Sequence, residues 1–126
     1  MYLLDTHALL FFLNNDPALS LRARSIIENE WKLYISIVSF WEIAIKIGLG
    51  KLSISGSVTE LIKYCEENQI SILQIRASEL ERIPALPLHH RDPFDRLLIC
   101  QALDRGLTIL TKDQKIWGYE EVETVW

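Results

Sequence analysis

Short apolar runs alternate along this chain with segments whose apolar residues recur at helical spacing. The runs that predict strands are 1–4, 33–36, 70–75, 107–110 and 122–125. Helices are predicted over 6–13, from residue 20 onward, and over 39–47, 57–68, 77–83 and 93–105. Strands separated by helices pair in parallel through right-handed crossovers. The order of elements therefore predicts an α/β fold, a three-layer α/β/α sandwich with a central parallel sheet.

Four acidic residues stand at the exits of the apolar segments, and they are Asp5, Glu42, Asp95 and Asp113. Ligand sites in open α/β sheets lie at the carboxyl ends of the strands, so we expect these four carboxylates to converge. Hard oxygen ligands of this kind select Mg²⁺ or Mn²⁺. A metal held by carboxylates that keeps some of its waters is typical of enzymes that cut or transfer phosphates.

Each acid taken alone also fits a structural role. Asp5 could cap the helix that follows it, and Asp92 and Asp95 fit the first turn of the helix 93–105. Asp113 could be an ordinary turn residue after a strand. Taken together, however, helix N-termini that bring several carboxylates to one place leave like charges that repel one another without a cation. The joint pattern therefore favours a shared metal site.

Glu42 lies in the apolar segment 35–45, where an unpaired carboxylate is costly. It stands three residues after Ser39, which is the spacing of a capping box, and Lys46 lies one helical turn further on. Its carboxylate therefore needs either Lys46 or a metal ion as its partner.

The chain has 126 residues, of which 49% are hydrophobic, and we expect a single domain over residues 1–126. No apolar run is long enough to span a membrane, and the first residues lack the basic start and apolar stretch of a signal peptide. A cytoplasmic location without a membrane partner is therefore expected. Cys65 and Cys100 form no Cys-x-x-Cys pair, so neither a zinc site nor a redox motif is indicated.

The formal net charge of −4 does not indicate nucleic-acid binding, which usually accompanies a basic excess. Acids gathered around a metal can nevertheless make a chain acidic while local cations still meet a phosphate backbone. The basic residues close in sequence to the four acids are Lys46, Lys51, Arg91, Arg96 and Lys112. Each of these would by itself be a solvated surface charge.

Four ordered segments contain the acids: LLDTHALL at 3–10, IVSFWEIAIK at 37–46, LPLHHRDPFDRLLI at 86–99 and LTKD at 110–113. In this order and spacing they resemble PIN-domain ribonucleases, and in particular the VapC-like toxins of prokaryotic toxin–antitoxin pairs. The resemblance spans essentially the whole chain, and it holds at all four acidic positions.

The resemblance implies a metal-dependent endoribonuclease that binds one or two Mg²⁺ or Mn²⁺ ions and hydrolyses RNA phosphodiester bonds to a 5′-phosphate and a 3′-hydroxyl. Asp5, Glu42 and Asp95 would be the principal metal ligands, and Asp113 would complete the site directly or through water. The resemblance also implies an antitoxin protein whose tail blocks the site, and a homodimer. The apolar segments 10–13 and 40–41 could supply such contacts or could be core.

Several neighbouring residues have open roles. Thr6, Ser39 and Thr111 flank the acids and could orient a ligand carboxylate or a metal-bound water, but helix capping and strand-end hydrogen bonds are equally good explanations. Asp92 is expected to cap its helix rather than to touch a metal.

His89 and His90 are not assigned to the site, because adjacent side chains point apart and carboxylates suit Mg²⁺ better than imidazole. The tryptophans could stack RNA bases, but core or interface packing is the better explanation without an interleaved basic run. They are Trp31, Trp41, Trp117 and Trp126.

Other functions remain as alternatives. Asp5-Thr6-His7 lacks the Asp-x-Asp motif of haloacid-dehalogenase phosphatases, and the segment 3–6 lacks the paired acids that open a phosphoacceptor receiver site. The main alternative is a non-catalytic PIN-like module that binds RNA or protein. Metal-dependent cleavage of RNA separates this alternative from the nuclease.

Overall fold

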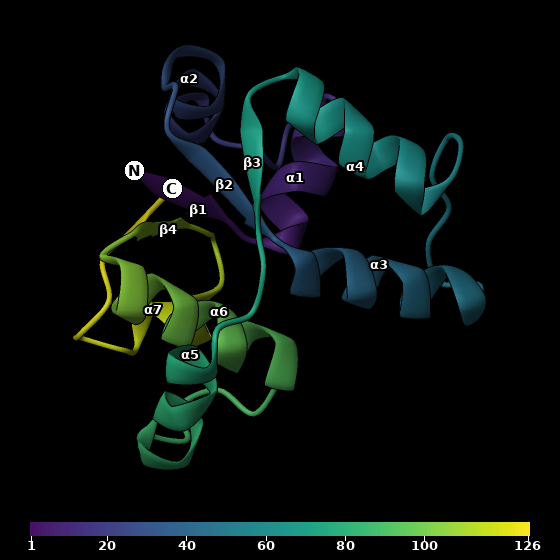
Figure 1. Cartoon of the computed structure of the whole chain (residues 1–126). Coiled ribbons are helices and arrows are strands. Elements are labelled where there is room, and N and C mark those ends of the chain that lie inside the picture. Colours follow the sequence, from purple (N-terminus) through teal and green to yellow (C-terminus); the bar gives the residue numbers. More distant parts are fainter.

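The computed structural model describes residues 1–126, and its centre is a sheet of five parallel strands (Figure 1). The strands are β1 Tyr2–Leu4, β2 Leu33–Ser36, β3 Ile70–Leu73, β4 Thr108–Leu110 and β5 Thr124–Val125. They lie in the order β3-β2-β1-β4-β5, so the first strand of the chain is the central one. The parallel sheet predicted from the alternation of elements is therefore confirmed.

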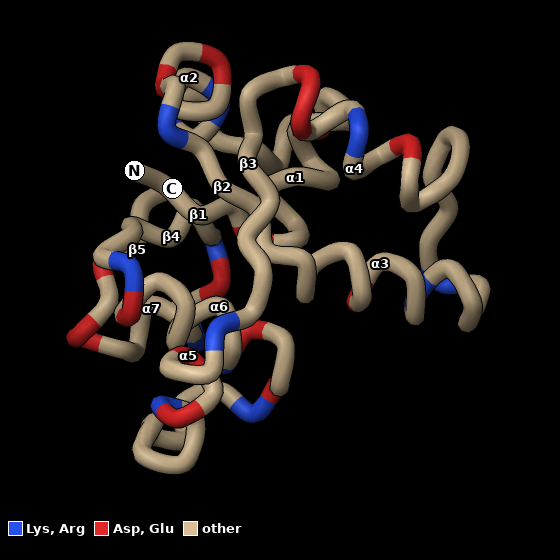
Figure 2. The backbone as a smooth tube through the Cα atoms, in the orientation of Figure 1, with Lys and Arg blue, Asp and Glu red and all other residues tan.

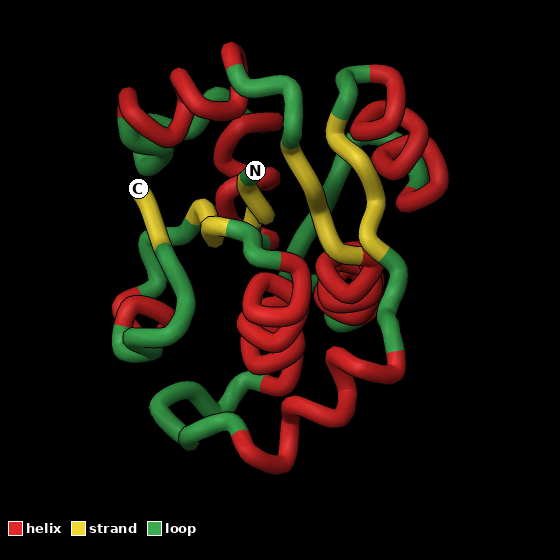
Figure 3. Tube along the Cα trace, turned by 60° about the vertical axis from the view of Figure 1, so that its left-hand side comes forward, coloured by secondary structure: helices red, strands yellow, loops and turns green.

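Helices lie on either side of the strands (Figure 3). They are α1 Thr6–Leu13, α2 Leu21–Asn29, α3 Ile37–Gly48, α4 Val58–Glu67, α5 Ala77–Arg82, α6 Pro93–Arg105 and α7 Gln114–Trp117, with a 3₁₀ turn η1 at Ile83–Ala85. None of these helices is long and apolar enough to cross a membrane.

The two faces of the sheet carry separate hydrophobic cores. Leu3 and Leu4 are both fully buried, and because side chains alternate along a strand they enter different cores. Leu4 packs with residues of α1, α2, α3 and α4, whereas Leu3 packs mainly with residues of α6 and α7. The free thiols of Cys65 and Cys100 are buried in these two cores. The three-layer sandwich is thereby confirmed.

The register of the sheet brings the ends of its central strands to one edge. Leu4, the last residue of β1, pairs with Ile35 on β2 and with Leu110 on β4. The chain then leaves β1 at Asp5 and β4 at Thr111 along the same edge. This alignment positions the residues described in the next subsection.

Helix α3 begins directly after β2, earlier than the sequence predicts. Ser36 is its N-cap, and the Ser36 hydroxyl accepts the backbone N–H of Val38 at 3.1 Å. Ser39 therefore lies inside the helix, and the predicted capping box between Ser39 and Glu42 is wrong. The local cause is that Ser36 itself is a good cap at the strand end, which leaves no linker before the helix.

Short elements account for the other differences from the predicted secondary structure. β3 ends at Leu73 rather than at residue 75, and η1 and α7 are absent from the prediction. α7 is only 4 residues long and too short to show a helical period. The predicted end of α6 is confirmed, because Gly106 adopts the left-handed backbone there with φ of +67°.

Arg96, in the first turn of α6, holds the loop that precedes this helix. Its guanidinium donates to four backbone carbonyls between 2.9 and 3.3 Å, those of Ile83, Leu86, Pro87 and His90. A planar guanidinium can donate in several directions at once, which an ammonium on a flexible stem does less well. Arg96 is thus occupied by its own chain and is not a free cation for a phosphate backbone.

Tyr119 completes this arrangement from the C-terminal side of the chain. Its ring is almost fully buried, its hydroxyl donates to the Pro87 carbonyl, and the same hydroxyl accepts the backbone N–H of His90 at 3.0 Å. Arg96 and Tyr119 together fix the loop of residues 86–90 against α6.

We expect Arg96→Lys to lower the free energy of unfolding by about 2 kcal/mol, because one ammonium leaves several of these carbonyls without a donor. Urea unfolding followed by circular dichroism measures the difference. Arg91→Lys, a change of the same kind at an exposed position, should leave the unfolding midpoint unchanged. Equal midpoints for the Arg96 and Arg91 variants would show that the carbonyls need no guanidinium.

Candidate functional site

The four acids predicted from the sequence act on one another in the folded chain. The pKa of Asp95 is raised to about 8, first by burial of its carboxyl group and then by repulsion from the other carboxylates, those of Asp92, Glu42, Asp5 and Asp113. Such repulsion requires that the groups lie close together. Contacts in the structure agree, because the Thr111 hydroxyl bonds with both Asp5 and Asp113, and the His90 Nε2 atom lies within 3.0 Å of both Asp95 and Asp113. Glu42 accepts the hydroxyl of Thr6, the residue that follows Asp5.

Asp5 is the most buried of the four, with 4% of its surface exposed. One carboxylate oxygen accepts the N–H of Ala8 at 2.7 Å and caps α1, and the other accepts the hydroxyl of Thr111 at 2.5 Å. Burial raises the pKa of Asp5 in spite of these bonds. The Thr111 hydroxyl also accepts the backbone N–H of Asp113 at 3.0 Å, so one threonine links two of the acids.

Glu42 projects from α3 and is also buried. Its carboxylate accepts the hydroxyl of Thr6 at 2.7 Å and pairs with the Lys46 ammonium at 3.0 Å. The ion pair expected from the sequence is present, and Thr6 binds the carboxylate rather than capping a helix. Glu42 is the one acid of the four with a lysine or arginine partner.

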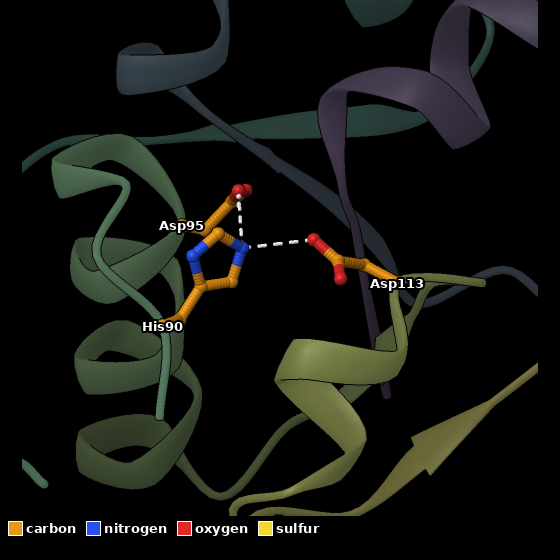
Figure 4. A group of neighbouring side chains, drawn as sticks. All are labelled: His90, Asp95 and Asp113. Carbon is orange, nitrogen blue, oxygen red and sulfur yellow. Dashed lines mark hydrogen bonds and ion pairs between the residues drawn. The ribbon is translucent and has the colours of Figure 1, made fainter. Parts of the chain in front are cut away.

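Asp95 and Asp113 are bridged by His90, which the sequence analysis did not assign to the site (Figure 4). The His90 Nε2 atom lies 2.8 Å from an oxygen of Asp113 and 3.0 Å from an oxygen of Asp95. These three residues offer ligand atoms within 4.8 Å of one another. The structure thus places His90 beside two of the predicted acids, a contact that its tandem position in the sequence did not indicate.

The two adjacent histidines do point apart, as expected. The exposed His89 packs its ring against the ring of Tyr119, with centroids 4.9 Å apart, and His90 is buried. No local sequence pattern indicates which of the two histidines is buried. His90 is the buried one because Arg96 and Tyr119 form hydrogen bonds with its backbone and hold it in place.

Asp92 is the N-cap of α6, in agreement with its expected role. Its carboxylate accepts the backbone N–H groups of Phe94 at 2.8 Å and Asp95 at 3.3 Å. Its own backbone N–H donates to the Nδ1 atom of His90 at 3.1 Å. Asp92 therefore forms hydrogen bonds with two residues of the cluster, Asp95 and His90, but it is not among the residues whose possible ligand atoms lie together.

Ser39 neither orients a carboxylate by a hydrogen bond nor caps a helix, which were the two roles expected from the sequence. It is buried, and its hydroxyl has no hydrogen-bond partner. It lies one helical turn before Glu42 on α3, a spacing that places both side chains on the same side of the helix. A buried hydroxyl without a partner is costly, so this position suits an additional polar group.

The balance of charge in the cluster favours a bound cation. Of the four acids only Glu42 has a lysine partner, and His90 is shared between two others. The donor atoms are mainly carboxylate oxygens, which bind hard divalent cations. Asp5, Glu42, Asp95 and Asp113 therefore form a donor set that fits Mg²⁺ or Mn²⁺.

The basic residues near the site are mostly occupied. Lys46 pairs with Glu42, Arg96 binds its own loop, and the Lys112 ammonium lies 5.4 Å from the centre of the Phe11 ring. Lys51 and Arg91 are exposed. Basic positions are spread over many elements rather than gathered on one of them (Figure 2).

Trp31, Trp41 and Trp117 are exposed, so packing in the core does not explain these three, and their packing in an interface stays a prediction. Trp126 is half-buried beside Phe11 and packs against one of the hydrophobic cores. Trp41 follows Phe40, which is in the core, and its ring packs edge-on against Phe94. This aromatic pair lies next in sequence to Glu42 and Asp95 and thus borders the acids.

Comparisons with known proteins agree with this fold. A family model described as the PIN domain matches residues 2–121. The chain is 26% identical over 127 residues to Ribonuclease VapC22 of Mycobacterium tuberculosis, with 98% of this chain and 97% of that protein covered.

Two solved structures share the fold at low sequence identity. VapBC2 from Rickettsia felis, bound to a DNA fragment from its promoter, superimposes with a TM-score of 0.71 at 16% identity and covers 98% of this chain and 96% of that one. FitAcB from Neisseria gonorrhoeae has a TM-score of 0.68 at 17% identity, with 100% and 97% covered.

In the metal-free protein, Asp95→Asn should raise the free energy of unfolding at pH 8 and leave it nearly unchanged below about pH 4. The pKa of Asp95 is about 8 when folded against 3.8 as the ordinary value, so between these pH values the folded chain binds the extra proton. The wild-type protein therefore loses stability as the pH rises through this window, and the asparagine variant does not.

Denaturant unfolding in EDTA over a pH series measures this difference. Asp16→Asn is the matched control, because Asp16 lies outside the cluster and its side chain accepts only the N–H of Ala18, which an asparagine oxygen can also accept. An Asp95→Asn variant that is less stable at every pH would mean that the carboxylate serves mainly to stabilise the first turn of α6.

Proposed function

The chain belongs to the PIN domain family, and we propose from this premise that it is a metal-dependent endoribonuclease, the toxin of a toxin–antitoxin pair. The observation that carries the proposal is the gathering of carboxylates at one edge of the sheet, where Thr111 links Asp5 to Asp113 and His90 links Asp113 to Asp95. The relative named as a ribonuclease aligns over nearly the whole chain and supports the same reaction.

Asp5, Glu42, Asp95 and Asp113 would hold the Mg²⁺ or Mn²⁺. When bound, such an ion makes its water a nucleophile near neutral pH and neutralises charge on the scissile phosphate. Two threonine hydroxyl groups of the chain orient the carboxylates that would bind the metal. Thr111 orients the Asp5 carboxylate, and Thr6 orients that of Glu42.

The exposure of the acids indicates from which side the RNA approaches. Asp5 and the Glu42 side chain are at most 8% exposed, whereas the side chains of Asp95 and Asp113 are 19% and 34% exposed. The phosphodiester would therefore reach the site between the beginnings of α6 and α7.

The attacking water would leave a 5′-phosphate on one product and a 3′-hydroxyl on the other. The reaction would take place in the cytoplasm, where the RNA is. Because the chain has an overall charge of −4 and few free cations at the site, the metal itself would supply much of the attraction for the phosphate backbone.

Solved relatives with this fold are described as complexes, one of them as a toxin–antitoxin complex from Klebsiella pneumoniae. We propose that the present chain likewise binds an antitoxin protein. A cavity of about 400 Å³ between the end of α1 and α4 offers a surface of mixed polar and apolar character, and it is lined by Leu10, Leu13, Asn14, Ser53, Ile54, Ser55, Glu60, Leu61 and Tyr64. The predicted contact segment 10–13 thus contributes to this surface.

A homodimer is proposed through the exposed side of α3. Trp41 and Ile45 on α3, and Leu49 directly after it, follow one another every four residues and are all exposed. Residues four apart lie on one side of a helix, so the three side chains form a continuous apolar stripe.

Purified protein should cleave a mixed RNA pool in Mg²⁺ or Mn²⁺ but not in EDTA, and Asp5→Asn should lower the rate by at least about 100-fold through loss of several kcal/mol of metal-dependent stabilisation. End-labelled oligonucleotides identify the phosphate at the cut. Asp16→Asn is the control, since Asp16 only accepts the N–H of Ala18 in a turn that asparagine also forms.

The result that contradicts the nuclease is a wild-type protein that neither cuts RNA nor gains thermal stability from the metal. That pair of results would leave a non-catalytic PIN-like binding module. Thermal stabilisation by Mn²⁺ without cutting would show that the metal site exists and that the substrate is more demanding.

Sedimentation measurements test the dimer. Leu49→Asp should shift the purified chain from dimer to monomer, because a carboxylate in the apolar stripe would be buried without a partner. Leu21→Asp is the matched control, since Leu21 is 87% exposed on α2, outside the stripe. A monomeric wild-type chain at micromolar concentration, or a dimer unchanged by Leu49→Asp, would rule out this interface.

A further inference from the structure

His90 stands between two acids that no secondary structure element holds together. Asp95 lies in the first turn of α6 and Asp113 precedes α7, and the His90 Nε2 atom lies within 3.0 Å of a carboxylate oxygen of each (Figure 4). His90 is 6% exposed, and a hydrogen bond in so buried a place is poorly replaced by water. The imidazole is therefore the direct link between these two carboxylates.

The other ring nitrogen decides where the imidazole carries its hydrogen. Nδ1 accepts the backbone N–H of Asp92 at 3.1 Å, so Nδ1 has a lone pair and no hydrogen. A neutral imidazole with a bare Nδ1 carries its hydrogen on Nε2. The Nε2–H group then donates to the oxygens of Asp95 and Asp113 in a shared hydrogen bond.

This tautomer conflicts with metal binding by His90. A metal ligand needs the lone pair of Nε2, and freeing it would move the hydrogen to Nδ1. There it would face the N–H of Asp92, and two donors would oppose each other in a buried position. The same change would remove the only donor that Asp95 and Asp113 share.

The backbone of His90 is held as firmly as its ring. Its N–H donates to the Tyr119 hydroxyl at 3.0 Å, and its carbonyl accepts from the Arg96 guanidinium at 3.2 Å. With Asp92 on Nδ1, the residue has partners from three places in the sequence. The imidazole thus has a fixed position from which to hold the more exposed Asp113.

We propose that His90 is a positioning residue whose Nε2–H holds the Asp95 and Asp113 carboxylates at the spacing that a divalent cation needs, without itself binding the cation. The metal role of this arrangement rests on the proposed function, whereas the hydrogen-bonded bridge stands on the geometry alone. Carboxylates that ligate metals are commonly oriented by such partners, whose removal costs about 10- to 100-fold in metal affinity.

The tautomer is tested by nitrogen NMR of the ¹⁵N-labelled protein, with correlations from the carbon-bound ring hydrogens and with His90→Gln to assign the signals. Nε2 should be the protonated nitrogen of His90 before and after Mg²⁺ is added. A protonated Nδ1, or loss of the Nε2 hydrogen when Mg²⁺ binds, would overturn the proposal in favour of a metal-ligating histidine.

Metal affinity is tested by calorimetry with Mg²⁺ and with Mn²⁺. His90→Ala should weaken the binding of both ions by a similar factor of about 10- to 100-fold. His90→Gln, which keeps an N–H donor at the end of its side chain, should recover part of this loss. His89→Ala, the same truncation at the exposed neighbour, should bind both ions as the wild-type protein does.

The outcomes separate this inference from the proposed function. Equal affinities for wild-type protein and His90→Ala would overturn the positioning role alone. A loss confined to Mn²⁺ would identify His90 as a ligand, because imidazole favours transition metals over Mg²⁺. A wild-type protein that binds neither ion would overturn the proposed function and the metal role of His90 together. Urea unfolding confirms that the compared variants are folded, and His90→Gln serves if the alanine variant is not.

Discussion

Repulsion between carboxylates that are removed from water is the constraint on which this molecule depends. A parallel sheet with β1 at its centre brings Asp5 and the acids of the neighbouring segments to one edge. Burial and then repulsion from the neighbouring carboxylates raise the pKa of Asp95 to about 8, which favours its protonated form. The surrounding hydroxyls, Lys46 and His90 lower this cost in part, and a divalent cation would remove most of the remainder.

Capping a helix and joining the cluster are compatible uses of one carboxylate, because it has two oxygens. One oxygen of Asp5 caps α1 while the other accepts the Thr111 hydroxyl. One oxygen of Asp113 accepts the N–H of Lys115 at the start of α7 while the other faces His90. The helix dipoles also favour negative charge at these positions. The capping role of Asp5 and Asp113 therefore does not exclude the proposed metal-binding role, although the sequence presents the two as alternatives.

Features that depend on short segments of sequence could be predicted, whereas features that depend on contacts between distant segments could not. The order of the elements and the four acids could be predicted, because strand and helix patterns and the position of an acid are properties of short segments. The inward turn of His90 depends on Arg96 and Tyr119, and no short segment contains all three. The predicted start of α3 was wrong because Ser36 and Ser39 are both plausible caps in the sequence, and it is Ser36 at the end of β2 that caps the helix.

The separation in sequence between Asp5 and Thr111 has a consequence for the synthesis of the protein. They are 106 residues apart, and β1 receives its partner β4 only after the whole intervening segment has been made. Domains form as their segments leave the ribosome, and pairing of distant strands is slow. A nascent chain that ends before β4 lacks Thr111 and Asp113, so the acids at the edge of the sheet come together only after β4 has been made. A product of interrupted translation that stops short of β4 therefore lacks the complete site.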